Sequence, residues 1–108
     1  MAKKRRKNYW DPGYPVTLTG AGPWRESISN PGSFYREIFV EMDGNPIGRQ
    51  YVDQGMENYQ QKAWDAILEE LDRGTHIRGV GAIIQADDGS LSLDCDHFRF
   101  EEIIEVDR

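Results

Sequence analysis

Two Asp-Gly turn signals constrain this chain most, because each lies between segments in which apolar and polar residues alternate. The first is Asp43-Gly44-Asn45-Pro46 and the second is Asp87-Asp88-Gly89. Asp, Asn and Gly tolerate the positive φ angles that tight hairpin turns require. Two hairpins within 108 residues predict a mainly antiparallel sheet.

The segment before the first turn, residues 34–42, has two distinct faces. Phe34, Ile38, Val40 and Met42 fall on one face, whereas Tyr35, Glu37, Phe39 and Glu41 fall on the other. This period of two predicts a strand. Residues 47–52 are expected to return as the second arm of the hairpin.

The second turn also separates two predicted strands. Residues 77–86 carry few charges and indicate a central strand, and residues 91–95 alternate as a half-buried strand does. A last strand is predicted over residues 98–106, where Phe98, Phe100, Ile104 and Val106 share one parity. A short helix over Glu101–Asp107 is the competing interpretation of this end.

One helix is predicted between the hairpins, over about residues 55–73. Met56, Tyr59, Ala63, Ile67 and Leu71 recur there at spacings of three and four. Residues 9–33 are rich in Pro and Gly and leave room for a short strand at 16–19. The expected fold is therefore α+β, a mainly antiparallel sheet of about five or six strands with the helix on one face.

Charge divides the chain into two parts. Five consecutive cations open it, namely Lys3, Lys4, Arg5, Arg6 and Lys7. Without them, 8 Lys and Arg face 19 Asp and Glu, a net charge of −11 on the rest of the chain. We expect residues 1–8 to form a disordered basic arm and residues 9–108 to form a single α+β domain.

Composition also bears on the compartment. No apolar run approaches 18 residues, so no membrane partner is expected. Cys95 is the single cysteine and has no intramolecular disulfide partner, which indicates a reducing compartment or indifference to redox conditions. The basic start is followed by Asn8 and Tyr9 rather than by an apolar signal-peptide core. We therefore expect a cytoplasmic protein.

The leading functional hypothesis rests on acidic residues near the end of the helix. Asp65, Glu69, Glu70 and Asp72 form the predicted acidic face. Such a face suits a non-enzymatic accessory protein, of inhibitor or immunity type, that binds a basic protein. Small acidic domains of this kind are common on phages and mobile elements, which is an argument from association.

Two alternative functions remain open. Trp10, Trp24 and Trp64 could line an apolar pocket for a small ligand between the sheet and the helix. The basic arm could instead bind nucleic acid through its phosphates. An exposed edge strand could in addition pair two copies into a homodimer.

Two charged residues interrupt predicted apolar strand faces, Arg36 in the first strand and Glu102 in the last. A buried charge is costly without a partner, so we predict a structural Arg36–Glu102 ion pair. No catalytic motif, cofactor fingerprint or metal-ligand spacing stands out. The run Asp94-Cys95-Asp96-His97 would point successive side chains to opposite faces of a strand, which disfavours a metal site.

Overall fold

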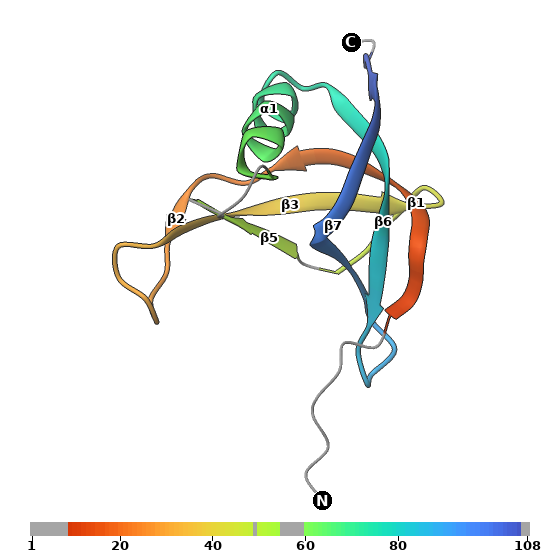
Figure 1. Cartoon of the computed structure of the whole chain (residues 1–108), viewed down its shortest axis with the longest axis horizontal. Helices are drawn as coiled ribbons and strands as arrows, with labels where there is room; N and C mark the ends of the chain where they lie inside the picture. The colour runs from red at the N-terminus through yellow and green to blue at the C-terminus, as the bar shows by residue number, and fades with distance from the viewer. Residues whose placement is uncertain (1–8, 49, 55–59, 107–108) are drawn as a thin grey trace, which may run out of the picture.

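A computed structural model of the chain describes residues 9–48, 50–54 and 60–106 (Figure 1). The elements in chain order are β1 (Tyr9–Ala21), β2 (Arg25–Glu26), β3 (Phe34–Met42), β4 (Asn45–Pro46), β5 (Gln50–Asp53), α1 (Gln60–Asp72), β6 (His76–Gln85) and β7 (Leu91–Ile104). All strand pairs are antiparallel. The expected α+β fold is thus confirmed, but with seven strands in the described residues rather than five or six.

The predicted turns and the end of the chain can be compared directly with the structure. Asp43 and Gly44 have φ angles of 51° and 82°, as expected for a tight hairpin turn. Residues 98–104 belong to β7, so the strand is confirmed and the competing helix is wrong. The first part of the predicted helix, residues 55–59, and the basic arm, residues 1–8, lie outside the described residues.

The first strand is much longer than predicted. The sequence indicated a short strand at 16–19, whereas β1 spans 13 residues and includes Pro12 and Pro15. Its pairing with β6 shifts register between Tyr9 and Asp11 and again between Asp11 and Tyr14. The second shift spans Pro12, where an interrupted ladder accommodates the missing N–H, whereas Pro15 stays in register opposite Val80.

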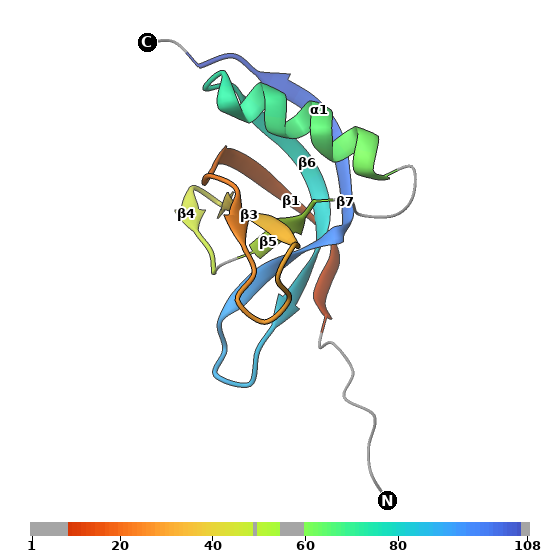
Figure 2. The same cartoon turned by 90° about the vertical axis from the view of Figure 1, so that its left-hand side faces the viewer.

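β1 is the centre of a strongly curled sheet. Its first part, from Tyr9 to Leu18, pairs with β6, and its last part, from Thr17 to Ala21, pairs with β3. The strand order is β2-β3-β1-β6-β7, with β4 and β5 both paired to β3. Figure 2 shows the sheet bending around α1 and bringing β5 toward β7.

A seam between β5 and β7 brings the two sides of the sheet together. The backbone N–H of Gly48, just before β5, donates to the carbonyl of Leu91 at 2.8 Å. A Cβ atom at position 48 would lie 2.7 Å from that carbonyl oxygen, so the close approach requires glycine. The side chain of Gln50 spans the same seam, since Nε2 donates to the Ile38 carbonyl at 2.9 Å and Oε1 accepts from the Leu93 N–H at 3.0 Å. The long strands therefore form a partly open five-stranded barrel.

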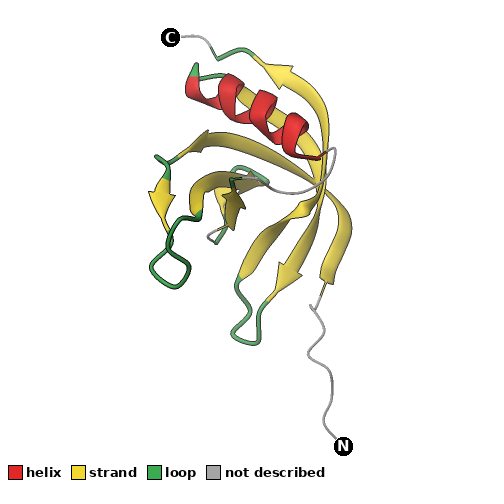
Figure 3. Ribbon diagram, turned by 60° about the vertical axis from the view of Figure 1, so that its left-hand side comes forward, coloured by secondary structure: helices red, strands yellow, loops and turns green. Residues whose placement is uncertain are grey.

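The core fills the inside of this barrel, and α1 packs over it (Figure 3). Four helix residues, Trp64, Ile67, Leu68 and Leu71, join the inward side chains of the strands in one cluster. Leu18, Ile38, Ile77 and Ile83 are its largest fully buried side chains. Ile67 and Leu71 of the helix stripe are thus buried as their spacing predicted. On β3, Ile38, Val40 and Met42 are buried as predicted, whereas Phe34 on the same predicted face is 36% exposed.

We predict that Gln50→Leu lowers the free energy of unfolding by about 2–4 kcal/mol, because the Leu93 N–H loses its partner in a buried seam. Urea unfolding measures this change. The matched control is Gln85→Leu, at an exposed position at the end of β6, which should shift stability by under about 0.5 kcal/mol. Equal effects of the two substitutions would show that the Gln50 amide does not hold the seam.

Candidate functional site

The predicted acidic face on α1 is partly neutralised by two arginines of the same chain. Arg73 contacts Glu69 at 3.1 Å and Glu70 at 3.3 Å. Asp72 pairs with Arg36 at 2.6 Å, and only Asp65 has no ion-pair partner among the described residues. The four carboxylates therefore lie together, as the helical spacing implies, but three of them have internal partners.

Arg36 is bound through three different N–H groups. Its Nη1 and Nη2 donate to the two carboxylate oxygens of Asp72 at 3.0 and 2.6 Å, and its Nε donates to the Gly22 carbonyl at 2.7 Å. The guanidinium carbon also lies 5.6 Å from the centre of the Trp24 ring. This paired geometry is specific to arginine, and the hydrogen bonds from Arg36 lower the pKa of Asp72 below its usual value.

The predicted Arg36–Glu102 ion pair is wrong. Glu102 is exposed and pairs with Arg78 on the neighbouring strand at 2.7 Å. The reason is a bulge in β7. Arg78 is opposite Glu102 but Gly79 is opposite Phe100, so one extra residue reverses the alternation expected from the sequence. Arg36 does interrupt an apolar face, since it is 7% exposed, but its partner comes from the helix.

The predicted tryptophan pocket is not formed by Trp24 and Trp64. Trp64 is buried in the core, packs against Phe98 with ring centres 5.6 Å apart, and donates its indole N–H to the Cys95 carbonyl. Trp24 is 41% exposed and lies beside Arg36, at the other end of α1. The side chain of Trp10 and the cations of the basic arm lie outside what the structure describes.

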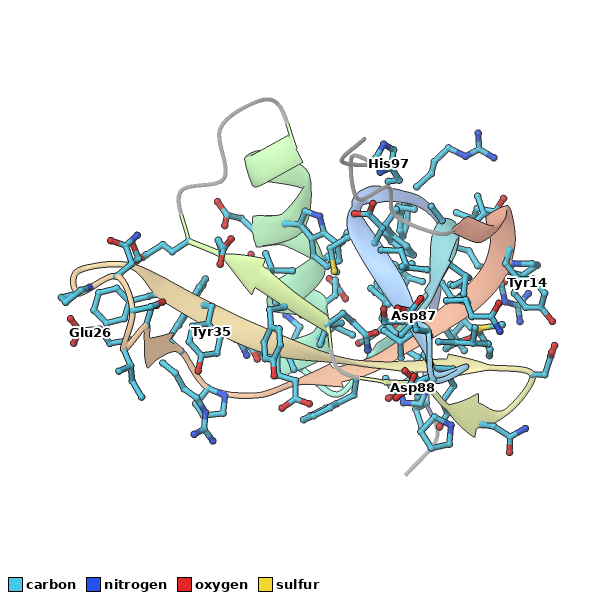
Figure 4. The ribbon with its side chains drawn as sticks, turned by 90° about the horizontal axis from the view of Figure 1, so that it is seen from below. Tyr14, Glu26, Tyr35, Asp87, Asp88 and His97 are labelled. Carbon is cyan, nitrogen blue, oxygen red and sulfur yellow. The ribbon has the colours of Figure 1, made fainter. Side chains whose placement is uncertain are left out.

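A different face, the outer side of β3 and β5, gathers three partly exposed aromatic rings. Phe39 and Tyr51 are each 46% exposed. The Tyr35 and Tyr51 rings meet edge to face with centres 5.3 Å apart. Figure 4 shows Tyr35 on β3 and Glu26 farther out, toward the β2–β3 loop. The aromatic residues follow one another along a single face of the sheet.

Carboxylates alternate with these rings. Glu37 and Glu41 flank Phe39 on β3, while Asp53 is opposite Tyr35 on β5. None of the three carboxylates forms an ion pair with a described residue. This acidic aromatic face, defined by Tyr35, Glu37, Phe39, Glu41, Tyr51 and Asp53, therefore keeps its negative charge.

The acidic aromatic face contains a hollow of about 120 Å³. It is lined by Thr19 of β1, residues 37–41 of β3 and residues 46–48. Gly20 lies opposite Phe39, and a Cβ atom there would be 3.2 Å from the Phe39 ring. The missing side chain lets the ring lie against β1 at the edge of the hollow.

This face was missed as a site, although its signal was present in the sequence. The alternation of residues 34–42 already placed Tyr35, Glu37, Phe39 and Glu41 together on the side away from the core. The sequence instead favoured the helix as the binding face, because its acidic residues are more closely spaced. Counting carboxylates without their arginine partners overestimates how much negative charge a helix presents, because cations three or four residues away pair with them.

The run from Asp94 to His97 forms a local pair instead of a cluster. Asp94 is buried and its carboxylate lies 3.0 Å from Nδ1 of the exposed His97. Over the described ranges, no three His, Cys, Asp or Glu side chains come together as a metal site. Within the same ranges, no helix is long and apolar enough to cross a membrane.

Comparisons with known proteins identified no relative of this chain. No family model, no curated protein and no solved structure matches the chain. The functional argument therefore depends on the residues of this chain alone.

We predict that Arg36 and Asp72 are energetically coupled. Asp72→Asn should cost about 1–3 kcal/mol, because Arg36 then loses its only described anionic partner. Arg36→Met should also destabilise, and the double variant should cost less than the sum of the two. Urea unfolding of all four proteins measures the coupling, and strict additivity would contradict the pair.

The same pair predicts an acid dependence of stability. A carboxyl group whose pKa is lower in the folded state stabilises the fold above its unfolded pKa, about 3.9 for Asp, and this contribution disappears as the pH falls through the folded pKa. The stability difference between the wild type and Asp72→Asn should therefore be largest above about pH 5 and shrink below about pH 4. Urea unfolding across this range tests it, and a constant difference would contradict it.

Proposed function

We propose that the protein is a non-enzymatic binding protein of inhibitor or immunity type, which holds a basic partner on its acidic aromatic face. The observation that carries this proposal is the hollow in β3, where Glu37 and Glu41 flank the exposed ring of Phe39. The partner is a protein segment that presents Lys or Arg side chains.

The chemistry of the hollow fits a cationic head group. An ammonium or guanidinium over an aromatic ring is attracted by the negative face of the ring. A carboxylate on either side can accept charge-assisted hydrogen bonds from the same group. Because Glu37 and Glu41 have no described internal partner, a cation that enters the hollow breaks no existing ion pair.

Long-range attraction supports the same partner. The chain has a formal net charge of −6, and the basic arm accounts for five of its cations. A basic protein would therefore approach the remaining surface in a favourable field, which raises the rate of association. The arginine-paired carboxylates of α1 contribute to this field, while the unpaired carboxylates of β3 and β5 provide the contact.

The arrangement of strands suggests the same place for a ligand. Partly open five-stranded Greek-key barrels of the OB type bind oligonucleotides or oligosaccharides on the face of their second and third strands. Here the second and third long strands are β3 and β5. This likeness concerns the arrangement of strands only and points to a location rather than to a ligand.

Nucleic acid is disfavoured on this face. Its aromatic rings could stack on bases, but Glu37, Glu41 and Asp53 would repel the phosphates. The alternative of nucleic-acid binding therefore depends on the basic arm, Lys3 to Lys7. It makes a different prediction, because the arm and the acidic aromatic face can be altered separately.

We predict that Glu37→Gln combined with Glu41→Gln weakens binding of a fluorescent Arg-rich decapeptide about 10-fold, because two contacts to the cation are lost. Fluorescence anisotropy measures the affinity. The matched control is Glu69→Gln combined with Glu70→Gln, which removes the same charge from α1 and should change affinity under about 2-fold. Binding should also weaken as salt rises toward about 0.15 M.

Three outcomes would contradict the proposal. Equal losses in the two double variants would show that only net charge matters. If the decapeptide does not bind even at low salt, the hypothesis of a basic partner is wrong. Binding of a single-stranded oligonucleotide that disappears when residues 1–8 are deleted, with no peptide binding, would favour the nucleic-acid alternative.

A further inference from the structure

The loop between β2 and β3 projects an isoleucine completely into solvent. Ile28 is 100% exposed, more than any other large apolar side chain described. In Figures 1 and 3 the loop extends from the body of the molecule, away from α1 and the end of β7. An isolated exposed Leu or Ile is common on surfaces, but one at the tip of a projecting loop is placed to insert into a partner.

Hydrogen bonds within the loop hold this shape. The backbone of Ser27 donates to the Ser33 carbonyl at 2.8 Å, and the Ser33 N–H donates to the Asn30 carbonyl at 3.0 Å. The carboxylate of Glu26 accepts the Gly32 N–H at 2.9 Å. A preorganised loop loses little conformational entropy on binding, which favours its use as an anchor. We call residues 27–33 the finger.

An apolar hollow of about 210 Å³ lies between α1 and β7. Five of its lining residues are apolar, and the sixth is Glu70; the set is Ala66, Ile67, Glu70, Ile77, Phe100 and Ile103. Phe100 and Ile103 are each 46% exposed, although the sequence pattern predicted Phe100 on a buried face. Apolar cavities of roughly 150 Å³ already accept a molecule the size of benzene, so one branched side chain fits here.

Finger and hollow are complementary in charge as well as in polarity. The finger itself, residues 27–33, contains no charged residue, and the one charged residue that lines the hollow is Glu70. Arg25 at its base is exposed and has no ion-pair partner among the described residues. It can therefore approach Glu70 of a second copy. Most of the remaining surface is acidic and would repel a second copy.

We propose that the protein self-associates by inserting Ile28 of one copy into the hollow between α1 and β7 of another. The finger extends away from α1 and the end of β7, which line the hollow of its own chain, so the contact is made between copies. A two-fold dimer would use both fingers and both hollows, whereas a head-to-tail contact would leave one of each free at the ends. The inference does not depend on the proposed function.

Sedimentation across a wide range of protein concentration tests the proposal. Ile28→Asp removes the anchor, and Ala66→Glu fills the hollow from an exposed helix position. Each should raise the dissociation constant about 10- to 100-fold, as expected for loss of one buried Ile. The charge-matched controls, Ser29→Asp in the finger and Gln85→Glu at the end of β6, should change it under about 2-fold.

A mixing experiment makes the test specific. The Ile28→Asp protein keeps an intact hollow, and the Ala66→Glu protein keeps an intact finger. An equimolar mixture should therefore form a 1:1 complex that neither variant forms alone. Monomeric wild type at every concentration, equal losses in the controls, or no complex in the mixture would each overturn the proposal.

Salt separates this inference from the proposed function. An apolar contact between two chains of net charge −6 should persist or strengthen as salt rises, because screening reduces repulsion between the copies. Peptide binding on the acidic aromatic face should weaken under the same conditions. Self-association that weakens with salt in parallel with peptide binding would contradict insertion of Ile28.

Discussion

The fold depends on the seam at which β5 meets β7. Without it, the sheet would end in two open edges, and the inner faces of β3 and β6 would be farther from one another. The side chain of Gln50 satisfies backbone groups on both sides of the seam, and Gly48 lets the chains approach. A buried amide with both ends bonded is stabilising, and it also fixes which strands meet.

Arg36 connects β3 to the helix α1 and to the segment that follows β1. It binds the last turn of α1 through Asp72 and the end of β1 through the Gly22 carbonyl. β3 thereby holds both the helix and the segment from which the finger begins. The interaction also explains why the helix presents less free negative charge than its sequence suggests, because the Asp72 carboxylate is bound to Arg36.

The sequence predicted those features that depend on local period. The two faces of residues 34–42, the helix stripe and the Asp-Gly turns all follow from spacing and turn chemistry. Spacing could not reveal the bulge before Glu102, since one extra residue reverses every later side chain. Nor could it show that Gln50 spans a seam or that β1 continues through two prolines. Both depend on partners that are distant in the sequence.

The same limit explains why the candidate face was overlooked. Glu37 and Glu41 were correctly placed outside the core, but only the structure shows that no described cation neutralises them while Glu69, Glu70 and Asp72 are paired. A chain of net charge −6 attracts basic partners wherever its carboxylates stay free, and repels its own copies wherever they crowd. The finger contributes little to that repulsion, because residues 27–33 contain no charged side chain. Charge thus favours a basic partner on the acidic aromatic face and a second copy at the finger, and the two surfaces adjoin where the β2–β3 loop leads into β3.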